Sequence, residues 1–76
     1  MATPSTEPIP ILKQLGARIR AMREELHMSQ KEFAAVCQID AGSLCRLEHG
    51  SRNTTVLHLA RLAQGLDVDI VDLLKP

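Results

Sequence analysis

Residues 29–50 read SQKEFAAVCQIDAGSLCRLEHG, and this stretch predicts two short helices joined by a tight turn. Ser29 is followed three residues later by Glu32, the spacing of a capping box, in which each side chain accepts an amide hydrogen bond at the helix start. Asp40 predicts the start of the second helix, because a carboxylate there meets the positive end of the helix. Small Ala34 lies where the two helices would cross closely.

The rest of the chain predicts three more helices around this pair. From Ile11 onward, apolar residues recur at three- and four-residue spacing, which places one apolar stripe along a first helix. The stripe comprises Leu12, Leu15, Ile19, Met22 and Leu26. Gly50 can adopt the left-handed conformation that ends the third helix. Thr55 caps a fourth helix, and Asp69, with Asp72 three residues later, begins a short fifth one.

The predicted fold class is therefore all-α, a compact domain of five helices without strands. Its central pair has the arrangement of a helix-turn-helix, a motif that places its second helix in the major groove of DNA. A chain of 76 residues fits one small domain. Three prolines in residues 1–10 predict a flexible N-terminal arm, and residues 11–76 form the domain.

Composition and charge bound the class of protein. No apolar run approaches the roughly 20 residues of a membrane helix, and no signal peptide is recognisable, so we expect a cytoplasmic protein. The net charge is zero, but it is unevenly distributed. Residues 13–61 carry eight basic and five acidic side chains, whereas residues 62–76 are acidic. We therefore expect the basic central region to face DNA and the C-terminal segment to face away.

Four segments of the sequence resemble the lambda-repressor-like, Cro-type helix-turn-helix family, also called the XRE family. They are LGARIR at 15–20, MSQ at 28–30, LEHG at 47–50 and RN at 52–53. The resemblance covers residues 15–74 without a gap. It implies a homodimer that binds an inverted-repeat operator in double-stranded DNA, and a transcriptional regulator such as a repressor. The loop at 52–55 lacks the proline common after the asparagine, and it resembles the controller proteins of restriction–modification systems.

The resemblance also implies which residues contact DNA. Gln30 would donate to a phosphate at the start of its helix. Four residues of the following helix, Ala41, Gly42, Ser43 and Arg46, would face the major groove. Arg52, Asn53 and Thr54 would follow the phosphate backbone in the loop beyond.

These assignments differ in what the side chains can do. Ala41 can touch a thymine methyl, and Gly42 lets the helix approach closely, but neither has a side chain that forms hydrogen bonds. Arg46 is the one long donor on the face, and bidentate contact with guanine is the commonest specific pairing. For Arg46, a phosphate contact or an exposed ion pair remains an alternative. Gln30 could instead be an exposed residue that merely suits a helix, and the loop could be a solvated polar turn.

Other positions have structural interpretations. The resemblance implies a salt bridge between Arg23 and Glu48 that ties the first helix to the third. His27, Gln38 and Asp67 stand where relatives usually have glycine. Gln38 tolerates a positive φ less well than His or Asp, so its turn is expected to cost some stability or to adopt another geometry.

The cysteines and histidines do not indicate catalysis or a metal site. Cys37, Cys45 and His49 match no zinc motif in their spacing, and Cys37 stands at a buried leucine position of the family. We expect reduced thiols, no metal and no cofactor. The sequence also contains no recognisable combination of nucleophile and base, so we do not expect an enzyme. A redox switch at Cys45 stays open, because its thiol would lie on the helix that faces DNA.

Ile70, Val71 and Leu74 give the last helix more apolar surface than one small core needs, which predicts a homodimer through the last two helices. Two other roles for the fold stay open. One is a protein-binding adaptor without DNA recognition, which Ala41, Gly42 and the zero net charge favour. The other is an antitoxin that binds both DNA and a toxin. A protein partner would then be the toxin or part of the transcription machinery.

Overall fold

The computed structural model describes residues 10–51 and 53–75 of the chain. The N-terminal arm expected up to residue 10 therefore lies outside the described residues except for Pro10, which already belongs to the first helix. Arg52 also lies outside them. In the described part of the chain, the secondary structure consists of five helices and contains no strand, as predicted. They are α1 (Pro10–Glu25), α2 (Gln30–Cys37), α3 (Ala41–His49), α4 (Val56–Leu66) and α5 (Ile70–Leu74).

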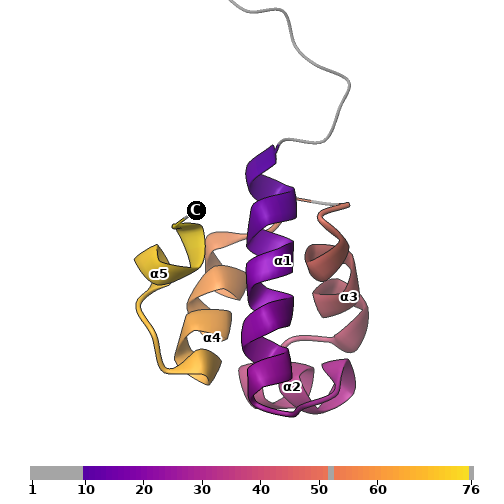
Figure 1. The fold of residues 1–76 in the computed structure, drawn as a ribbon. Helices are drawn as coiled ribbons and strands as arrows, with labels where there is room; N and C mark the ends of the chain where they lie inside the picture. The colour runs from indigo at the N-terminus through magenta and orange to yellow at the C-terminus, as the bar shows by residue number, and fades with distance from the viewer. Residues whose placement is uncertain (1–9, 52, 76) are drawn as a thin grey trace, which may run out of the picture.

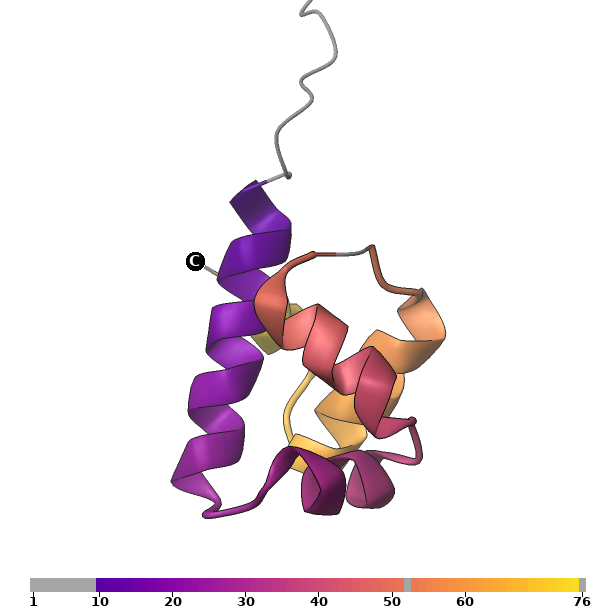
Figure 2. The same cartoon turned by 90° about the vertical axis from the view of Figure 1, so that its right-hand side faces the viewer.

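The helices surround one core. Helix α1 runs along the face of the molecule that is turned to the viewer in Figure 1, with α3 on one side of it and α4 and α5 on the other, while α2 lies beside its C-terminal end. Turned by 90°, the molecule presents α3 to the viewer, with the loop to α4 above it (Figure 2). The core is aliphatic apart from Phe33 and Cys37. Its largest fully buried side chains are Ile19, Phe33, Leu44, Leu62 and Leu73.

The helix starts follow the capping residues of the sequence. Ser29 and Glu32 form the expected capping box, since Glu32 N donates to Ser29 Oγ at 3.1 Å and Ser29 N donates to Glu32 Oε1 at 2.9 Å. Asp40 accepts from Ser43 N at 2.8 Å, and Thr55 accepts from His58 N at 3.1 Å. Each cap satisfies an amide that the first turn of a helix leaves without an intrahelical partner.

Four turns use left-handed backbone. Gly50 ends α3 with a φ of 65°. His27, Gln38 and Asp67, the three residues at glycine positions, adopt φ values of 57°, 59° and 57°. The turn at Gln38 therefore keeps the left-handed geometry rather than adopting another one.

One expectation for the first helix is wrong. Leu26 was placed on its apolar stripe, but α1 ends at Glu25 and Leu26 is exposed in the turn that follows. The apolar spacing thus continues one residue past the end of the helix, into the turn in which His27 adopts a positive φ. No helix in residues 10–51 or 53–75 has the length and apolarity that crossing a membrane requires.

Candidate nucleic-acid interface

Helix α3 has one buried and one exposed face. Leu44, Leu47 and Glu48 are buried against the rest of the domain. Side chains at the remaining positions point outward to different degrees. Ala41, Gly42, Arg46 and His49 are exposed, and Ser43 and Cys45 are half-buried. Because this helix lies at the front of the molecule in Figure 2, its outer face is open to a large ligand.

The N-terminal turn of α3 is held by Asp40. Its Oδ2 accepts from Ser43 N at 2.8 Å, and its Oδ1 accepts from Ser43 Oγ at 2.6 Å. The side-chain hydrogen bond from Ser43, followed by the backbone one, holds the pKa of Asp40 below its usual value. Asp40 therefore stays charged at neutral pH, and the Ser43 hydroxyl is engaged with it in the free protein.

Arg23 and Glu48 form a buried ion pair beneath this face. Arg23 Nε donates to Glu48 Oε2 at 2.7 Å, and Arg23 Nη2 donates to Glu48 Oε1 at 3.0 Å. Burial raises the pKa of Glu48, but hydrogen bonds from Arg23 and Gln30 outweigh it and leave the net pKa below its ordinary value. The pair joins α1 to α3, as the resemblance implied for these residues.

Gln30 takes part in the same network. Its Nε2 donates to Glu48 Oε1 at 3.0 Å, and the remaining Arg23 nitrogen, Nη1, donates to the Met28 carbonyl oxygen at 2.8 Å. The side chain of Gln30 is therefore not the free, exposed group that a merely helix-compatible residue would present. Its amide nitrogen carries a second hydrogen, which remains available for another acceptor.

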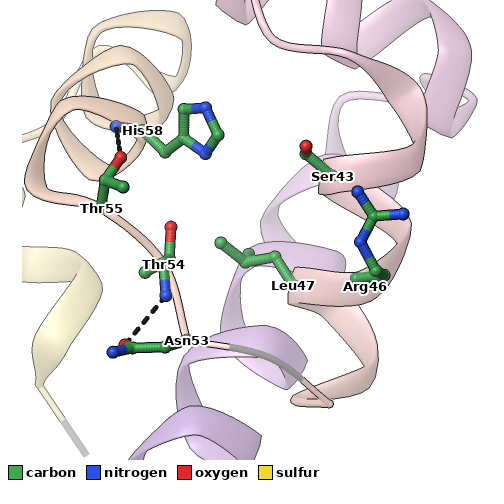
Figure 3. Close-up of a pocket in the computed structure, with 7 residues that line it drawn as sticks. All are labelled: Ser43, Arg46, Leu47, Asn53, Thr54, Thr55 and His58. Atoms are coloured by element: carbon green, nitrogen blue, oxygen red, sulfur yellow. Dashed lines mark hydrogen bonds between the residues drawn. The ribbon is translucent and has the colours of Figure 1, made fainter.

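A cavity of about 170 Å³ lies between α3 and the start of α4. It brings together the predicted residues Ser43, Arg46, Asn53 and Thr54 with residues of α4 and its cap (Figure 3). Its lining residues are Ser43, Arg46, Leu47, Asn53, Thr54, Thr55 and His58. Thr54 Oγ1 is buried, and no described residue hydrogen-bonds to it. The cavity unites the exposed side of α3 with the loop after it.

His58 is the residue of this cavity that the sequence did not single out. It projects from the first turn of α4 toward α3 (Figure 3). The sequence did contain a hint of this position. His58 lies three residues after the predicted cap Thr55 and thus in the first turn of a helix whose start faces the loop. The sequence pattern alone does not bring that turn close to Ser43.

The two cysteines have different environments. Cys37 is buried in the core, and burial raises the pKa of its thiol to about 11. Cys45 is half-buried on α3, where its Sγ lies 3.7 Å from His49 Nδ1. Burial thus shields the Cys37 thiol from reagents, whereas the Cys45 thiol is only half-buried. Within residues 10–51 and 53–75, no three His, Cys, Asp or Glu side chains are grouped closely enough to bind a metal ion.

The three residues predicted for a dimer lie in α5, on the side of α1 away from α3. Ile70 is half-buried and packs against the core. Val71 is 60% exposed, and Leu74 is also exposed. Ile70 therefore contributes to the core of the single chain, whereas Val71 and Leu74 lie on its surface.

Comparison with known proteins gives a consistent family. A family model described as "Helix-turn-helix" matches residues 19–73. The HTH-type transcriptional regulator y4dJ of Sinorhizobium fredii is 38% identical over 64 residues, which cover 84% of this chain and 83% of that protein. The control protein C.MunI of Mycoplasma is 28% identical over 61 residues, covering 79% of this chain and 82% of the relative.

A solved structure extends the likeness to the whole fold. The restriction–modification controller protein C.AhdI from Aeromonas hydrophila superimposes with a TM-score of 0.81 at 28% identity. The match covers 86% of this chain and 98% of C.AhdI. The five helices, the exposed α3 and these relatives agree, and the chain belongs to the helix-turn-helix family of XRE-type transcriptional regulators.

Proposed function

We propose that this protein is a transcriptional regulator that binds an inverted-repeat operator as a homodimer, with α3 in the major groove of double-stranded DNA. The observation that carries the proposal is the outer face of α3, where small residues surround one long cationic donor, Arg46. A helix with such a face fits a groove about 12 Å wide. The regulator acts by binding, not by catalysis.

Arg46 is the residue we assign to base recognition. Its neighbours Ala41 and Gly42 let α3 approach the base edges closely, and Ala41 adds an apolar contact for a thymine methyl. Bidentate donation to guanine O6 and N7 is the commonest specific contact of an arginine. Sequence preference then depends mainly on Arg46, with Ser43 as a second polar contact.

The phosphate contacts are assigned to two helix starts. At α2, the second hydrogen of the Gln30 side-chain amide and the backbone amides of the first turn would donate to a phosphate. Just before the start of α4, Asn53 and Thr54 line the same cavity as Arg46 (Figure 3). Arg52 belongs to the same loop by its sequence position. Such contacts position the domain without reading sequence.

Two arginines test this division of roles. A duplex is first selected from a random-sequence pool with the wild-type protein, and a scrambled duplex of equal composition serves as the reference. Arg46→Ala should weaken binding to the selected duplex by roughly 1–3 kcal/mol and leave the scrambled duplex nearly unaffected. Arg52→Ala, the matched control, should weaken both duplexes alike and reduce the salt slope by about one unit.

Other outcomes would support other roles. Equal weakening of both duplexes by Arg46→Ala would make Arg46 a phosphate contact. Absence of salt-dependent binding to any duplex would contradict DNA recognition and favour a protein-binding adaptor. Copurification of a stable protein partner together with specific DNA binding would favour an antitoxin over a free-standing regulator.

A further inference from the structure

Gly42 leaves a narrow space between two charged groups, the N-cap carboxylate of Asp40 and the guanidinium of Arg46 on α3. A Cβ atom built at Gly42 would lie 3.2 Å from Asp40 Oδ2 and 3.4 Å from Arg46 Nη1. The guanidinium of Arg46 thus lies across the N-terminal turn, directly over the missing side chain. Helical side chains lean toward the N-terminus, so a long residue at position 46 passes over position 42, four residues earlier.

Asp40 is a fixed neighbour at the end of this path. Its carboxylate accepts two hydrogen bonds from Ser43, at 2.8 and 2.6 Å, so its position is set by the helix start. The two hydrogen bonds from Ser43 lower the pKa of Asp40 most, and the charge of Arg46 adds the smallest of the contributions that lower it. The ion pairs of 4 Å or less in the described part of the chain do not include Asp40 with Arg46.

We propose that Asp40 and Gly42 are positioning residues for Arg46, which together hold its guanidinium over the first turn of α3 for base recognition. This inference rests on the proposed DNA-binding function. Gly42 leaves room for the Arg46 side chain to pass over the first turn of α3, and Asp40 supplies a fixed negative charge near its guanidinium. Because the attraction acts without a direct ion pair, the five donors of the guanidinium stay available for a base edge.

This arrangement favours specificity over affinity. An arginine side chain has many rotamers, and restricting them before binding reduces the entropy lost on contact with a base. The same carboxylate repels phosphates, so it weakens binding to every duplex. Asp40 should therefore lower general affinity while raising the preference for the operator.

Asp40→Asn tests the charge, because asparagine is an equally good N-cap and keeps the helix start. Binding to the scrambled duplex should strengthen, whereas the ratio of operator to scrambled affinity should fall about two- to tenfold, within the range of coupling between neighbouring residues. Asp69→Asn, at the start of α5, is the matched control, and its affinity ratio should stay at the wild-type value.

Gly42→Ala tests the path. Alanine favours the helix, so the melting temperature should hold or rise. The affinity ratio should nevertheless fall, since the new methyl would lie 3.2 Å from Asp40 Oδ2 and 3.4 Å from Arg46 Nη1 and would crowd the space between the two side chains. An effect on stability alone would indicate that Gly42 is merely a helix residue. A fall in melting temperature with an unchanged ratio would contradict the proposal as well.

A double-mutant cycle separates positioning from direct contact with DNA. In an Arg46→Ala background, Asp40→Asn and Gly42→Ala should no longer change the affinity ratio. Persistence of their effect there would overturn the proposal, because both residues would then act on DNA directly. If the wild-type protein selects no preferred duplex at all, the proposed function itself fails.

A measurement without DNA distinguishes failure of the positioning role from failure of the proposed DNA-binding function. In NMR spectra of the free wild-type protein, Arg46 side-chain protons should show NOEs to the Gly42 Hα protons, and Asp40→Asn should weaken them. Absence of these NOEs in the wild type would contradict the positioning role whatever the protein binds.

Discussion

The ion pair of Arg23 and Glu48 links three segments of the chain at one buried point. Arg23 belongs to α1 and Glu48 to α3, and both also bond to the start of α2, through the Met28 carbonyl and the Gln30 amide. Their side chains are 11% and 2% exposed. Loss of one partner leaves the other charge buried and uncompensated, which costs far more than loss of a surface pair.

Glu48→Gln should therefore lower the free energy of unfolding by about 3 kcal/mol, a large part of the stability of a small domain. Urea titration followed by circular dichroism measures the change. Glu24→Gln is the matched control, because Glu24 pairs with Arg20 on the surface, where the side chains are 57% and 64% exposed. It should cost less than about 0.5 kcal/mol. Equal losses in the two variants would contradict a special role for the buried pair.

The pH dependence of stability follows from the same carboxylate. The folded pKa of Glu48 lies below the unfolded value of about 4.3, so the pair stabilises the fold above that pH. Its contribution is lost as pH falls through the folded pKa. The gap in unfolding free energy between the wild type and Glu48→Gln should be full at pH 7 and should narrow below about pH 4. A gap that stays constant down to pH 3 would assign the loss to packing instead.

At the level of helices, caps and apolar spacing predicted most of the fold. Ser29, Asp40 and Thr55 each begin a helix because their oxygens accept amides within three residues, an interaction that local sequence determines. Leu26 shows the limit, since apolar periodicity does not reveal where a positive φ will turn the chain. His58 shows another limit, because its approach to Ser43 depends on how α3 and α4 pack.

The candidate site was predictable to a similar extent. Residues on one exposed helical face, such as Gly42 and Arg46, follow from helical geometry and from the family resemblance. The hydrogen bond from Gln30 to Glu48 did not follow, because it joins residues 18 positions apart in sequence and requires the crossing of two helices. The approach of the Asp40 and Arg46 side chains to the space above Gly42 did not follow from the sequence either, because it depends on side-chain conformation.

The turn after α2 offers a test of backbone strain. Gln38 adopts a φ of 59° and a ψ of 41°. This left-handed conformation disfavours most residues other than Gly, Asn and Asp. Gln38→Gly should raise the free energy of unfolding by about 0.5–1 kcal/mol, measured in urea. Arg61 Nη1 donates to the backbone oxygen of Gln38, so glycine keeps that hydrogen bond.

The control for this turn is Asp67→Gly, at the equivalent position after α4. Its φ of 57° is nearly the same, but aspartate tolerates left-handed backbone better than glutamine. Its gain should therefore be smaller than that of Gln38→Gly. Destabilisation by Gln38→Gly would mean that the glutamine side chain contributes more than the strain it imposes.

At the scale of the whole molecule, the proposed DNA-binding surface and the proposed dimer surface lie on opposite sides of α1. Helix α3 faces one way, and α5 lies on the other side of α1 with Val71 and Leu74 exposed (Figure 1). Pairing of two copies through α5 would bury these apolar side chains and would leave both α3 helices free. A two-fold axis would then present the two helices about one DNA turn apart, roughly 34 Å.

Val71→Glu tests this arrangement. Val71 is 60% exposed in a single chain, so glutamate should leave the domain folded but should place two like charges in the dimer interface. Sedimentation analysis should then give a monomer where the wild type gives a dimer, and affinity for a two-site operator should fall because each half-site binds alone. Val36→Glu, at a 52% exposed position on α2, is the matched control and should remain dimeric. A dimer of unchanged mass in Val71→Glu would exclude α5 as the interface, and the two α3 helices would need another symmetry to reach adjacent grooves.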